Sequence, residues 1–387
     1  MIYLDNAATS YQKPRSVRAA VLSAMRECAS PGRGGYRAAM TAAERVYRCR
    51  EAAGELFDCA PERVVFTMNA THALNIAVKS LVPPGGRAVI SGFEHNAVVR
   101  PLRALGANAV IAGRKLFDPA DTLRAFSREI TPDTDAVICT HVSNVFGYIL
   151  PVAQIAALCR ERGVPFVLDA SQSVGVLPVS LRDLGAAFIA MPGHKGLYGP
   201  QGTGLLLCGA MPKPLLQGGT GSLSRQAEMP DFLPDRAEAG TQNVAGICGL
   251  DAGIRFVKSR GLPAIRDHET ALCRLMARIL ERGGFRVFTG VNQSGVLSVC
   301  PPCDCELFAE KLAQRGVAVR AGLHCAPLAH ESAGTADCGT VRFSPSAFTT
   351  AGEADAAARI ALQCAEKIRK EAEKLPVSAC EFAGYKL

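Results

Sequence analysis

The sequence predicts an α/β fold, with a large domain built on a mainly parallel sheet flanked by helices and a smaller α+β domain at the C-terminal end. Between about residues 63 and 208, short β-branched runs alternate with longer helical patterns. The runs are also almost continuously apolar, which is typical of strands buried on both faces. Such alternation predicts βαβ units, whose crossover helices leave successive strands parallel.

The first elements of the large domain are two pairs of a strand and a helix. "RVVFT" precedes the helical pattern "HALNIAVKSL", and "RAVIS" precedes "NAVVRPLRALG". Four further apolar runs extend the predicted sheet: "DAVICTH" from Asp135, "PFVLDA" from Pro165, "AAFIA" from Ala186 and "GLLLC" from Gly204. Gly and Pro then accumulate up to residue 234, which predicts a long loop followed by a domain boundary.

The smaller domain begins with a helical pattern that runs from Val244 to about Glu281. Strand patterns "RVFTG", "GVLSVC" and "TVRFSP" follow, with a helix "ELFAEKLAQRG" between the last two. Residues 351–374 predict a surface helix, because apolar positions recur at three and four residues. We expect residues 15–250 to form the large domain, and residues 1–14 with 251–387 to form the small one.

Composition excludes several classes of protein. Of 387 residues, 48% are hydrophobic and 20% charged, which is typical of a folded chain of two or three domains. No apolar stretch approaches the roughly 20 residues needed to span a membrane. The net charge of +8 is not concentrated in a basic run, so it does not indicate a nucleic-acid partner. The 15 cysteines are scattered and follow no export signal, which predicts reduced thiols in the cytoplasm.

Two polar side chains at predicted strand ends favour pyridoxal phosphate as a cofactor. Lys195, in "MPGHKGLYGPQGTG", follows the strand "AAFIA", and its amine can form a Schiff base. Asp169 ends the run "PFVL", where a carboxylate can pair with a protonated pyridine nitrogen. Taken singly, Lys195 could be an exposed lysine in a glycine-rich turn, and Asp169 could cap a helix.

Two more candidate residues lie where a predicted strand is followed by a predicted helix. His95 follows "RAVIS" and could stack on a cofactor ring and move protons, or could simply begin a helix. Thr71 begins the helical pattern after "RVVFT", where its hydroxyl could bind phosphate at a positive helix end, or could belong to an ordinary first turn.

Together these residues resemble the cysteine desulfurases of the class V, fold-type I pyridoxal-phosphate enzymes, in the compact-loop branch that includes selenocysteine lyases. Matching segments run in family order along nearly the whole chain. They are "YLDNAAT" from Tyr3, "EHNAVV" from Glu94, "HVSNVFG" from His141, "DASQSVG" from Asp169, "GHKGLYGPQG" from Gly193, "EAGTQN" from Glu238, "RAGLHCAP" from Arg320 and "VRFSPSAFTT" from Val341.

The resemblance implies a set of contacts to the cofactor ring. Lys195 would bind the cofactor covalently, Asp169 would pair with the pyridine nitrogen, and His95 would stack on the ring as an acid and base. Gln172 would lie near the phenolic oxygen. Asn144 would face both the ring and the substrate.

At the phosphate, the resemblance implies Thr71 and His194. It also implies that Thr241 reaches the phosphate of the other subunit, and therefore that the protein is a homodimer. Two positions depart from the family: Pro192 replaces a common serine, and Ala70 replaces a common threonine. These departures concern the phosphate site and not the cofactor itself.

Two further matches concern the chemistry. Cys325 corresponds to the nucleophilic cysteine that accepts sulfur, and Arg342 to the arginine that holds the substrate α-carboxylate. A guanidinium binds a carboxylate through two hydrogen bonds, and a thiolate can take up sulfur and release it. An ordinary thiol is only slightly ionised at neutral pH, so we expect His324 or His95 to assist Cys325.

The resemblance implies conversion of L-cysteine to L-alanine, with the sulfur left as a persulfide on Cys325. A sulfur-acceptor protein, for example in iron–sulfur cluster assembly, would then receive the sulfur, because the stretch between Arg320 and Arg342 is too short for a long mobile arm. The alternatives are a lyase for L-selenocysteine, another class V aminotransferase or lyase, and a non-catalytic scaffold.

The segment "CPPCDC" contains Cys300, Cys303 and Cys305, and Cys-x2-Cys spacing can form half of a zinc site. A second pair is missing from the sequence, since Cys338 has no near partner along the chain. We therefore expect no metal and interpret these thiols as part of an ordinary loop.

Overall fold

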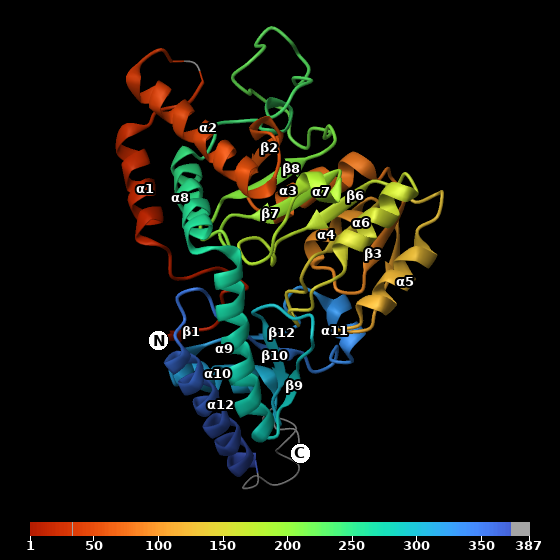
Figure 1. Ribbon diagram of the computed structural model, residues 1–387, viewed down its shortest axis with the longest axis vertical. Helices are drawn as coiled ribbons and strands as arrows, with labels where there is room; N and C mark the ends of the chain where they lie inside the picture. The colour runs from red at the N-terminus through yellow and green to blue at the C-terminus, as the bar shows by residue number, and fades with distance from the viewer. Residues whose placement is uncertain (33, 373–387) are drawn as a thin grey trace.

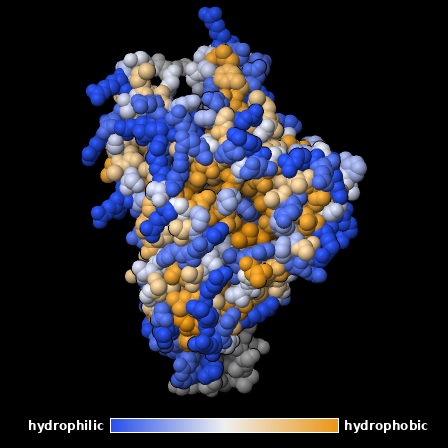
Figure 2. Space-filling model, in the orientation of Figure 1, coloured by the Kyte–Doolittle hydropathy of each residue, from blue (hydrophilic) through white to orange (hydrophobic). Residues whose placement is uncertain are grey.

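The computed structural model of the chain describes residues 1–32 and 34–372. Figure 1 shows a large upper domain that contains the main sheet and a smaller lower domain that contains the C-terminal elements. Helices α8 (Val244–Arg260) and α9 (Leu262–Arg282) follow one another as a column that joins the two. Hydrophilic side chains cover most of this face, and apolar side chains gather near its middle, where the domains meet (Figure 2).

The large domain is built on a seven-stranded sheet in the order β2-β8-β7-β6-β5-β3-β4. Only β8 runs against its neighbours, so the sheet is mainly parallel, as predicted. The strands are β2 (Val64–Thr67), β3 (Arg87–Ser91), β4 (Asn108–Ala112), β5 (Ala136–Thr140), β6 (Phe166–Asp169), β7 (Phe188–Pro192) and β8 (Gly204–Cys208). The sequence analysis missed β4, an edge strand whose residues are mostly half-buried.

Helices cover both faces of this sheet. One face packs against α3 and α4, and the other against α2, α5, α6 and α8, because alternate residues such as Val89 and Ile90 point to opposite sides. The helices before α8 are α1 (Arg15–Glu27), α2 (Arg37–Phe57), α3 (Ala70–Leu81), α4 (Asn96–Ala104), α5 (Pro119–Glu129), α6 (Val152–Glu161) and α7 (Leu181–Leu184), with 3-10 turns at Pro61–Arg63 and Asp235–Ala237.

The small domain contains an antiparallel sheet in the order β12-β13-β10-β9 and its own apolar core. Its strands are β9 (Arg286–Phe288), β10 (Leu297–Cys300), β12 (Arg320–Gly322) and β13 (Thr340–Phe343), and its helices after α9 are α10 (Cys305–Gln314), α11 (Pro327–Ala333) and α12 (Ala351–Ala372). The last two residues of the predicted surface helix and the tail to residue 387 lie outside the described residues.

The N-terminus is part of this small-domain structure. Strand β1 (Ile2–Tyr3) pairs in parallel with β11 (Val317–Ala318), and Leu4 is buried in the small-domain core. The division of the chain at residues 14 and 250 stays a prediction; α8 itself continues to Arg260.

A buried ion pair ties the loop after the main sheet to α2. The Arg50 guanidinium donates to both carboxylate oxygens of Glu238, at 2.8 and 2.6 Å, and both side chains are almost fully buried. The Phe66 amide of β2 donates to the same carboxylate at 2.6 Å, and the guanidinium lies over the Phe66 ring. Glu238 therefore anchors the segment that leads to Thr241.

We predict that Glu238→Ala lowers the free energy of unfolding by about 3 to 5 kcal/mol, because it leaves the Arg50 charge buried without its partner. Denaturant unfolding followed by circular dichroism measures this change. Glu27→Ala, which breaks the exposed ion pair with Arg45, is the matched control and should lower the free energy of unfolding far less, because water screens this pair. Equal losses in the two variants would contradict the role of burial.

Candidate active site

The ends of β5, β6 and β7 open into one cavity of about 510 Å³. Parallel strands end at the same edge of a sheet, so residues far apart in the chain meet there. The structure adds Asn69, Thr140 and Ser171 to the residues expected at this site. The residues singled out by sequence that line the cavity are Thr71, His95, Asn144, Asp169, Gln172, His194 and Lys195.

Asp169 is the last residue of β6, and its side chain is buried. Its Oδ1 atom accepts hydrogen bonds from the Ser171 amide at 2.9 Å and from the Ser171 hydroxyl at 2.5 Å. These bonds fix the carboxylate at the wall of the cavity. No sequence signal singled out Ser171, because serine is common after strand ends.

Lys195 follows β7 and lines the same cavity. Removal from water lowers the pKa of its amine to about 8, and the Asp169 carboxylate opposes this shift. The next residue, Gly196, packs so closely that a Cβ atom there would lie 2.0 Å from the Val174 carbonyl oxygen. Glycine after the lysine is thus a packing requirement, and it places Lys195 against the segment that carries Asp169 and Gln172.

His95 caps the N-terminus of α4. Its Nδ1 atom accepts a hydrogen bond from the Ala97 amide at 3.0 Å, so the proton of the neutral ring is on Nε2. Burial lowers the pKa of His95 below its ordinary value, although the Asp169 carboxylate opposes this. A neutral imidazole with a fixed tautomer therefore lines the cavity beside Asp169 and Lys195.

Glu94, the residue before His95, is fully buried behind the site. Its Oε1 atom accepts hydrogen bonds from the Thr140 amide at 2.7 Å and from the Ser91 hydroxyl at 2.5 Å. Oε2 has no hydrogen-bond partner among the described residues. Burial, with a smaller contribution from the Asp169 charge, raises the pKa of Glu94 to about 8. The acid thus ties the ends of β3 and β5 together in its protonated form near neutral pH.

The opposite end of the cavity is formed by the start of α3. Asn69 caps this helix by accepting a hydrogen bond from the His72 amide, and Thr71 lies in the first turn. Free amides at a helix N-terminus and a nearby hydroxyl are suitable for a phosphate group. Ala70 and Pro192 line this part of the wall without offering a hydroxyl, so the two departures from the family remain at the predicted phosphate site.

His194 contacts the N-terminal segment of the chain. Its Nδ1 atom lies 3.0 Å from the Thr9 hydroxyl, and its carbonyl oxygen accepts hydrogen bonds from Ser10 and from the Lys13 ammonium. Burial, together with the nearby charges of Lys195 and Lys13, lowers the pKa of His194 to about 4. Sequence analysis assigned no role to these N-terminal residues, although it recognised their segment.

Arg342 in β13 is almost fully buried, and its contacts join three distant segments. It donates to the Asn144 carbonyl oxygen at 3.0 Å and to Oδ1 of Asp5 at 2.7 Å. Arg320 in β12 forms an ion pair with the other Asp5 oxygen at 3.3 Å. The Nε atom of Arg342 has no hydrogen-bond partner among the residues that the structure describes.

Cys325 is exposed, and backbone contacts from the large domain hold it. His324 and Cys325 both have left-handed backbone conformations, with φ of 50° and 56°, which are strained for residues other than glycine. The Asn144 side chain donates to the His324 carbonyl oxygen at 2.8 Å, and the Asn96 amide donates to the Cys325 carbonyl oxygen at 2.8 Å. These bonds fix the turn that presents the thiol.

The His324 ring is engaged inside the small domain. Its Nε2 atom lies 3.1 Å from the Thr340 carbonyl oxygen, and the ring stacks on His330. Burial lowers the pKa of His324 to about 2. These contacts engage the His324 ring within the small domain, and assistance of the Cys325 thiol by His324 or His95 stays a prediction.

Thr241 lies away from the Lys195 cavity of its own chain. It lines a separate cavity of about 760 Å³ together with Phe66, His72 and Asn243. The predicted contact of Thr241 with a phosphate would therefore have to involve another subunit, and it stays a prediction.

The "CPPCDC" segment packs in the small domain. Cys303 and Cys305 belong to its apolar core, and burial raises the pKa of each thiol to about 12. Within residues 1–32 and 34–372, no three His, Cys, Asp or Glu side chains come together as metal ligands. No helix in the same ranges is both long and apolar enough to cross a membrane.

The donor set of the cavity fits pyridoxal phosphate. A lysine amine, a fixed carboxylate and a neutral imidazole surround a space whose far end is a helix N-terminus with a hydroxyl. These are the groups that the ring and the phosphate of this cofactor require.

Comparisons with known proteins show the family of this chain. The model of the aminotransferase class-V family matches residues 2–356. A probable cysteine desulfurase of Methanothermobacter thermautotrophicus is 31% identical over 369 residues, which cover 91% of this chain and 92% of that protein. One from Xylella fastidiosa is 33% identical over 358 residues, covering 87% and 85%. The chain belongs to the class-V aminotransferases and, within them, to the cysteine desulfurase family.

Solved structures show the same fold. The apo cysteine desulfurase of Thermococcus onnurineus NA1 superposes with a TM-score of 0.85 at 27% identity, covering 95% of each chain. The cysteine desulfurase CsdA of Escherichia coli gives a TM-score of 0.83 at 26% identity, also covering 95% of each chain. The predicted fold and family resemblance are thereby confirmed.

We predict that Glu94→Gln changes how stability depends on pH. The raised pKa of Glu94 means that the folded protein binds a proton which the unfolded chain loses above about pH 4.5. Stability therefore falls as pH rises toward 8, by up to about 1.4 kcal/mol per pH unit from this group. Glutamine cannot ionise, so the variant should gain stability relative to wild type as pH rises.

Denaturant unfolding at pH 5.5 and pH 8 measures this effect. The exposed Glu310→Gln is the control and should leave the difference between the two pH values unchanged. A Glu94→Gln variant with the same pH dependence as wild type would show that Glu94 is ionised in the folded protein.

Proposed function

We propose that this protein is a pyridoxal-phosphate-dependent cysteine desulfurase that converts L-cysteine to L-alanine and keeps the sulfur as a persulfide on Cys325. One observation carries the proposal: the small domain brings Arg342 and the exposed thiol of Cys325 to the large-domain loop of Asn144, whose side chain lines the cavity of Lys195. The names of the relatives favour cysteine over selenocysteine as the substrate.

The residues of the cavity would hold the cofactor in distinct ways. Lys195 would bind it covalently, Asp169 would pair with the pyridine nitrogen, and His95 would stack on the ring. Gln172 would contact the phenolic oxygen and Asn144 the face toward the substrate. The phosphate would lie between His194, Thr71 and Thr241 of a second subunit. When bound, the protonated ring supplies an electron sink for the substrate α-carbon.

Other steps, namely substrate binding and proton transfer, would depend on side chains of this chain. Arg342 binds the α-carboxylate of L-cysteine through its guanidinium. Because its pKa is lowered to about 8, Lys195 has a neutral fraction at neutral pH, and its Nζ atom can take the α-proton. His95, with its proton on Nε2, can exchange a proton with the substrate side of the cavity.

Sulfur transfer would take place at Cys325. Its thiolate Sγ forms an S–S bond to the sulfur of L-cysteine while the bond between that sulfur and Cβ breaks. The electron pair of the broken bond stays with the substrate carbon, which takes up a proton and becomes the methyl group of L-alanine. The sum is one thiol and L-cysteine giving one persulfide and L-alanine, so no external oxidant is needed.

We also propose the oligomeric state, the sulfur acceptor and the cellular location of this enzyme. A homodimer would explain why Thr241 lies outside the cavity of its own chain, and α1 and α2 expose apolar side chains such as Leu22, Met25 and Met40 that a second copy could cover. A sulfur-acceptor protein would take the persulfide sulfur from the exposed Cys325, as iron–sulfur cluster assembly requires. Such thiol chemistry suits the reducing cytoplasm.

We predict that Cys325→Ala loses alanine release from L-cysteine by a factor of at least about 100, because no other thiol is presented by this turn. The variant should still bind the cofactor, since Cys325 lies outside the cavity lining. Alanine release with and without a reductant, and mass spectrometry of the persulfide, measure the outcome. Alanine release at the wild-type rate in this variant would contradict the persulfide mechanism.

We predict that Lys195→Ala loses the visible absorption band of the covalently bound cofactor. Borohydride reduction followed by mass spectrometry should attach the cofactor to residue 195 in wild type and to no peptide in the variant. The matched control is Lys13→Ala, which removes a neighbouring amine that hydrogen-bonds to His194 but should keep the band. A band of unchanged intensity in Lys195→Ala would assign the cofactor bond to another residue.

A further inference from the structure

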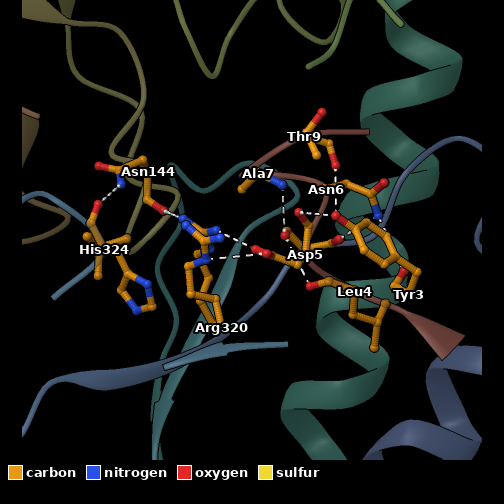
Figure 3. Close-up of polar contacts among 12 residues, drawn as sticks. Tyr3, Leu4, Asp5, Asn6, Ala7, Thr9, Asn144, Arg320 and His324 are labelled. Carbon is orange, nitrogen blue, oxygen red and sulfur yellow. Dashed lines mark hydrogen bonds and ion pairs between the residues drawn. The ribbon is translucent and has the colours of Figure 1, made fainter. Parts of the chain in front are cut away.

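The segment after β1 contacts residues of both domains near the candidate site, and Figure 3 shows Asp5 and Ala7 of this segment together with Asn144 and Arg320. The Ala7 amide donates to the Ser344 hydroxyl at 2.9 Å, and the Gln172 side chain donates to the Ala7 carbonyl oxygen at 2.9 Å. Two residues later, the Thr9 hydroxyl meets His194. The N-terminal segment is therefore a structural part of the site, with Asp5 at its substrate end.

Backbone pairing on both sides fixes Asp5. The Leu4 amide donates to the Ala318 carbonyl oxygen at 2.8 Å, and the Asn6 amide donates to the Ser344 carbonyl oxygen at 3.2 Å. The Tyr3 hydroxyl donates to the carbonyl oxygen of Asp5 itself. The carboxylate consequently has a set position and orientation, and its side chain is only 13% exposed.

The carboxylate of Asp5 holds Arg342 by one end. Nη2 of Arg342 donates to Asp5, and Nη1 donates to the Asn144 carbonyl oxygen. The remaining edge of the guanidinium consists of Nε and the second N–H of Nη2. Nε is buried and has no partner in the described part of the chain, although a buried charged donor is costly to leave unsatisfied.

We propose that Asp5 is a positioning residue for substrate binding: it anchors one end of Arg342 so that the buried Nε edge stays unpaired for the α-carboxylate of the amino acid. This inference rests on the proposed function. The unpaired edge has the two parallel N–H groups that bind a carboxylate bidentately. A fixed acid on the other side keeps the guanidinium in that orientation before substrate arrives.

The charges around Arg342 agree with a single carboxylate as ligand. Arg342 and Arg320 carry two positive charges, and Asp5 supplies one negative charge between them. One positive charge is left without a partner in this group, and one substrate carboxylate would balance it. Arg320 is half exposed, so water shields it, whereas Arg342 is 2% exposed and depends on these partners.

Asp5→Ala and Asp5→Asn test the proposal. Asp5→Ala should raise KM for L-cysteine by about tenfold or more while kcat changes little, because the anchor of a charged hydrogen bond is lost. Asp5→Asn keeps an oxygen acceptor at the same place and should restore part of the affinity. Asp355→Ala, which breaks an exposed ion pair with Arg359 in the same domain, is the matched control and should leave KM unchanged.

A second readout isolates the carboxylate. Titration of the cofactor-loaded protein with L-alanine, and separately with L-alanine methyl ester, is followed by the absorption band of the cofactor. Asp5→Ala should weaken binding of L-alanine about tenfold and leave the ester almost unaffected. A general loss of structure would weaken both ligands equally.

The outcomes separate this inference from the proposed function. If wild type releases no alanine from L-cysteine, the desulfurase proposal fails, and the L-alanine titration still decides the role of Asp5. Unchanged KM and unchanged L-alanine affinity in both Asp5 variants, or equal losses for L-alanine and its ester, would overturn the role assigned to Asp5.

Discussion

Much of the architecture depends on the burial of one guanidinium group, that of Arg342. A charge that is 2% exposed must have partners, and this arginine finds them in segments that lie far apart in the chain: Asp5 near the N-terminus and Asn144 after β5. The N-terminal residues therefore have to cross from the small domain to the cavity, and the pairing of β1 with β11 supplies the route. Burial of Arg342 thus joins the two domains at the site.

Asn144 extends the same network to the turn that carries Cys325. Its carbonyl oxygen receives Arg342, and its side chain holds the carbonyl oxygen of His324. Each left-handed residue in the turn at His324 and Cys325 costs on the order of 1 kcal/mol or more, so this conformation needs fixed partners. Arg342 and the turn that carries Cys325 consequently share one support, and displacement of either would disturb the other.

The sequence predicted the parts of the fold that depend on local patterns. Buried strands such as β5 and β6 were evident from continuous apolar runs, and Asp169, Lys195 and His95 from their places after strands. Strand β4 was missed because an edge strand has a mixed pattern. The pairing of β1 with β11 and the contact of Asp5 with Arg342 join residues more than 300 positions apart, and no periodicity within a short segment can show such contacts.

Burial also shifts the pKa values of ionisable side chains at the site. Burial lowers the pKa of Lys195 to about 8 and that of His194 to about 4, and it raises that of Glu94 to about 8. Each shift favours the neutral form of its group; Lys195 and His194 line the cavity, and Glu94 is buried behind it. The Asp169 carboxylate and the Arg342 guanidinium, each held by hydrogen bonds, then provide fixed charges of opposite sign. In the proposed reaction, an amino acid whose carboxylate binds the guanidinium would be oriented by it, and its α-proton would be taken by the Lys195 amine, which burial favours as a base.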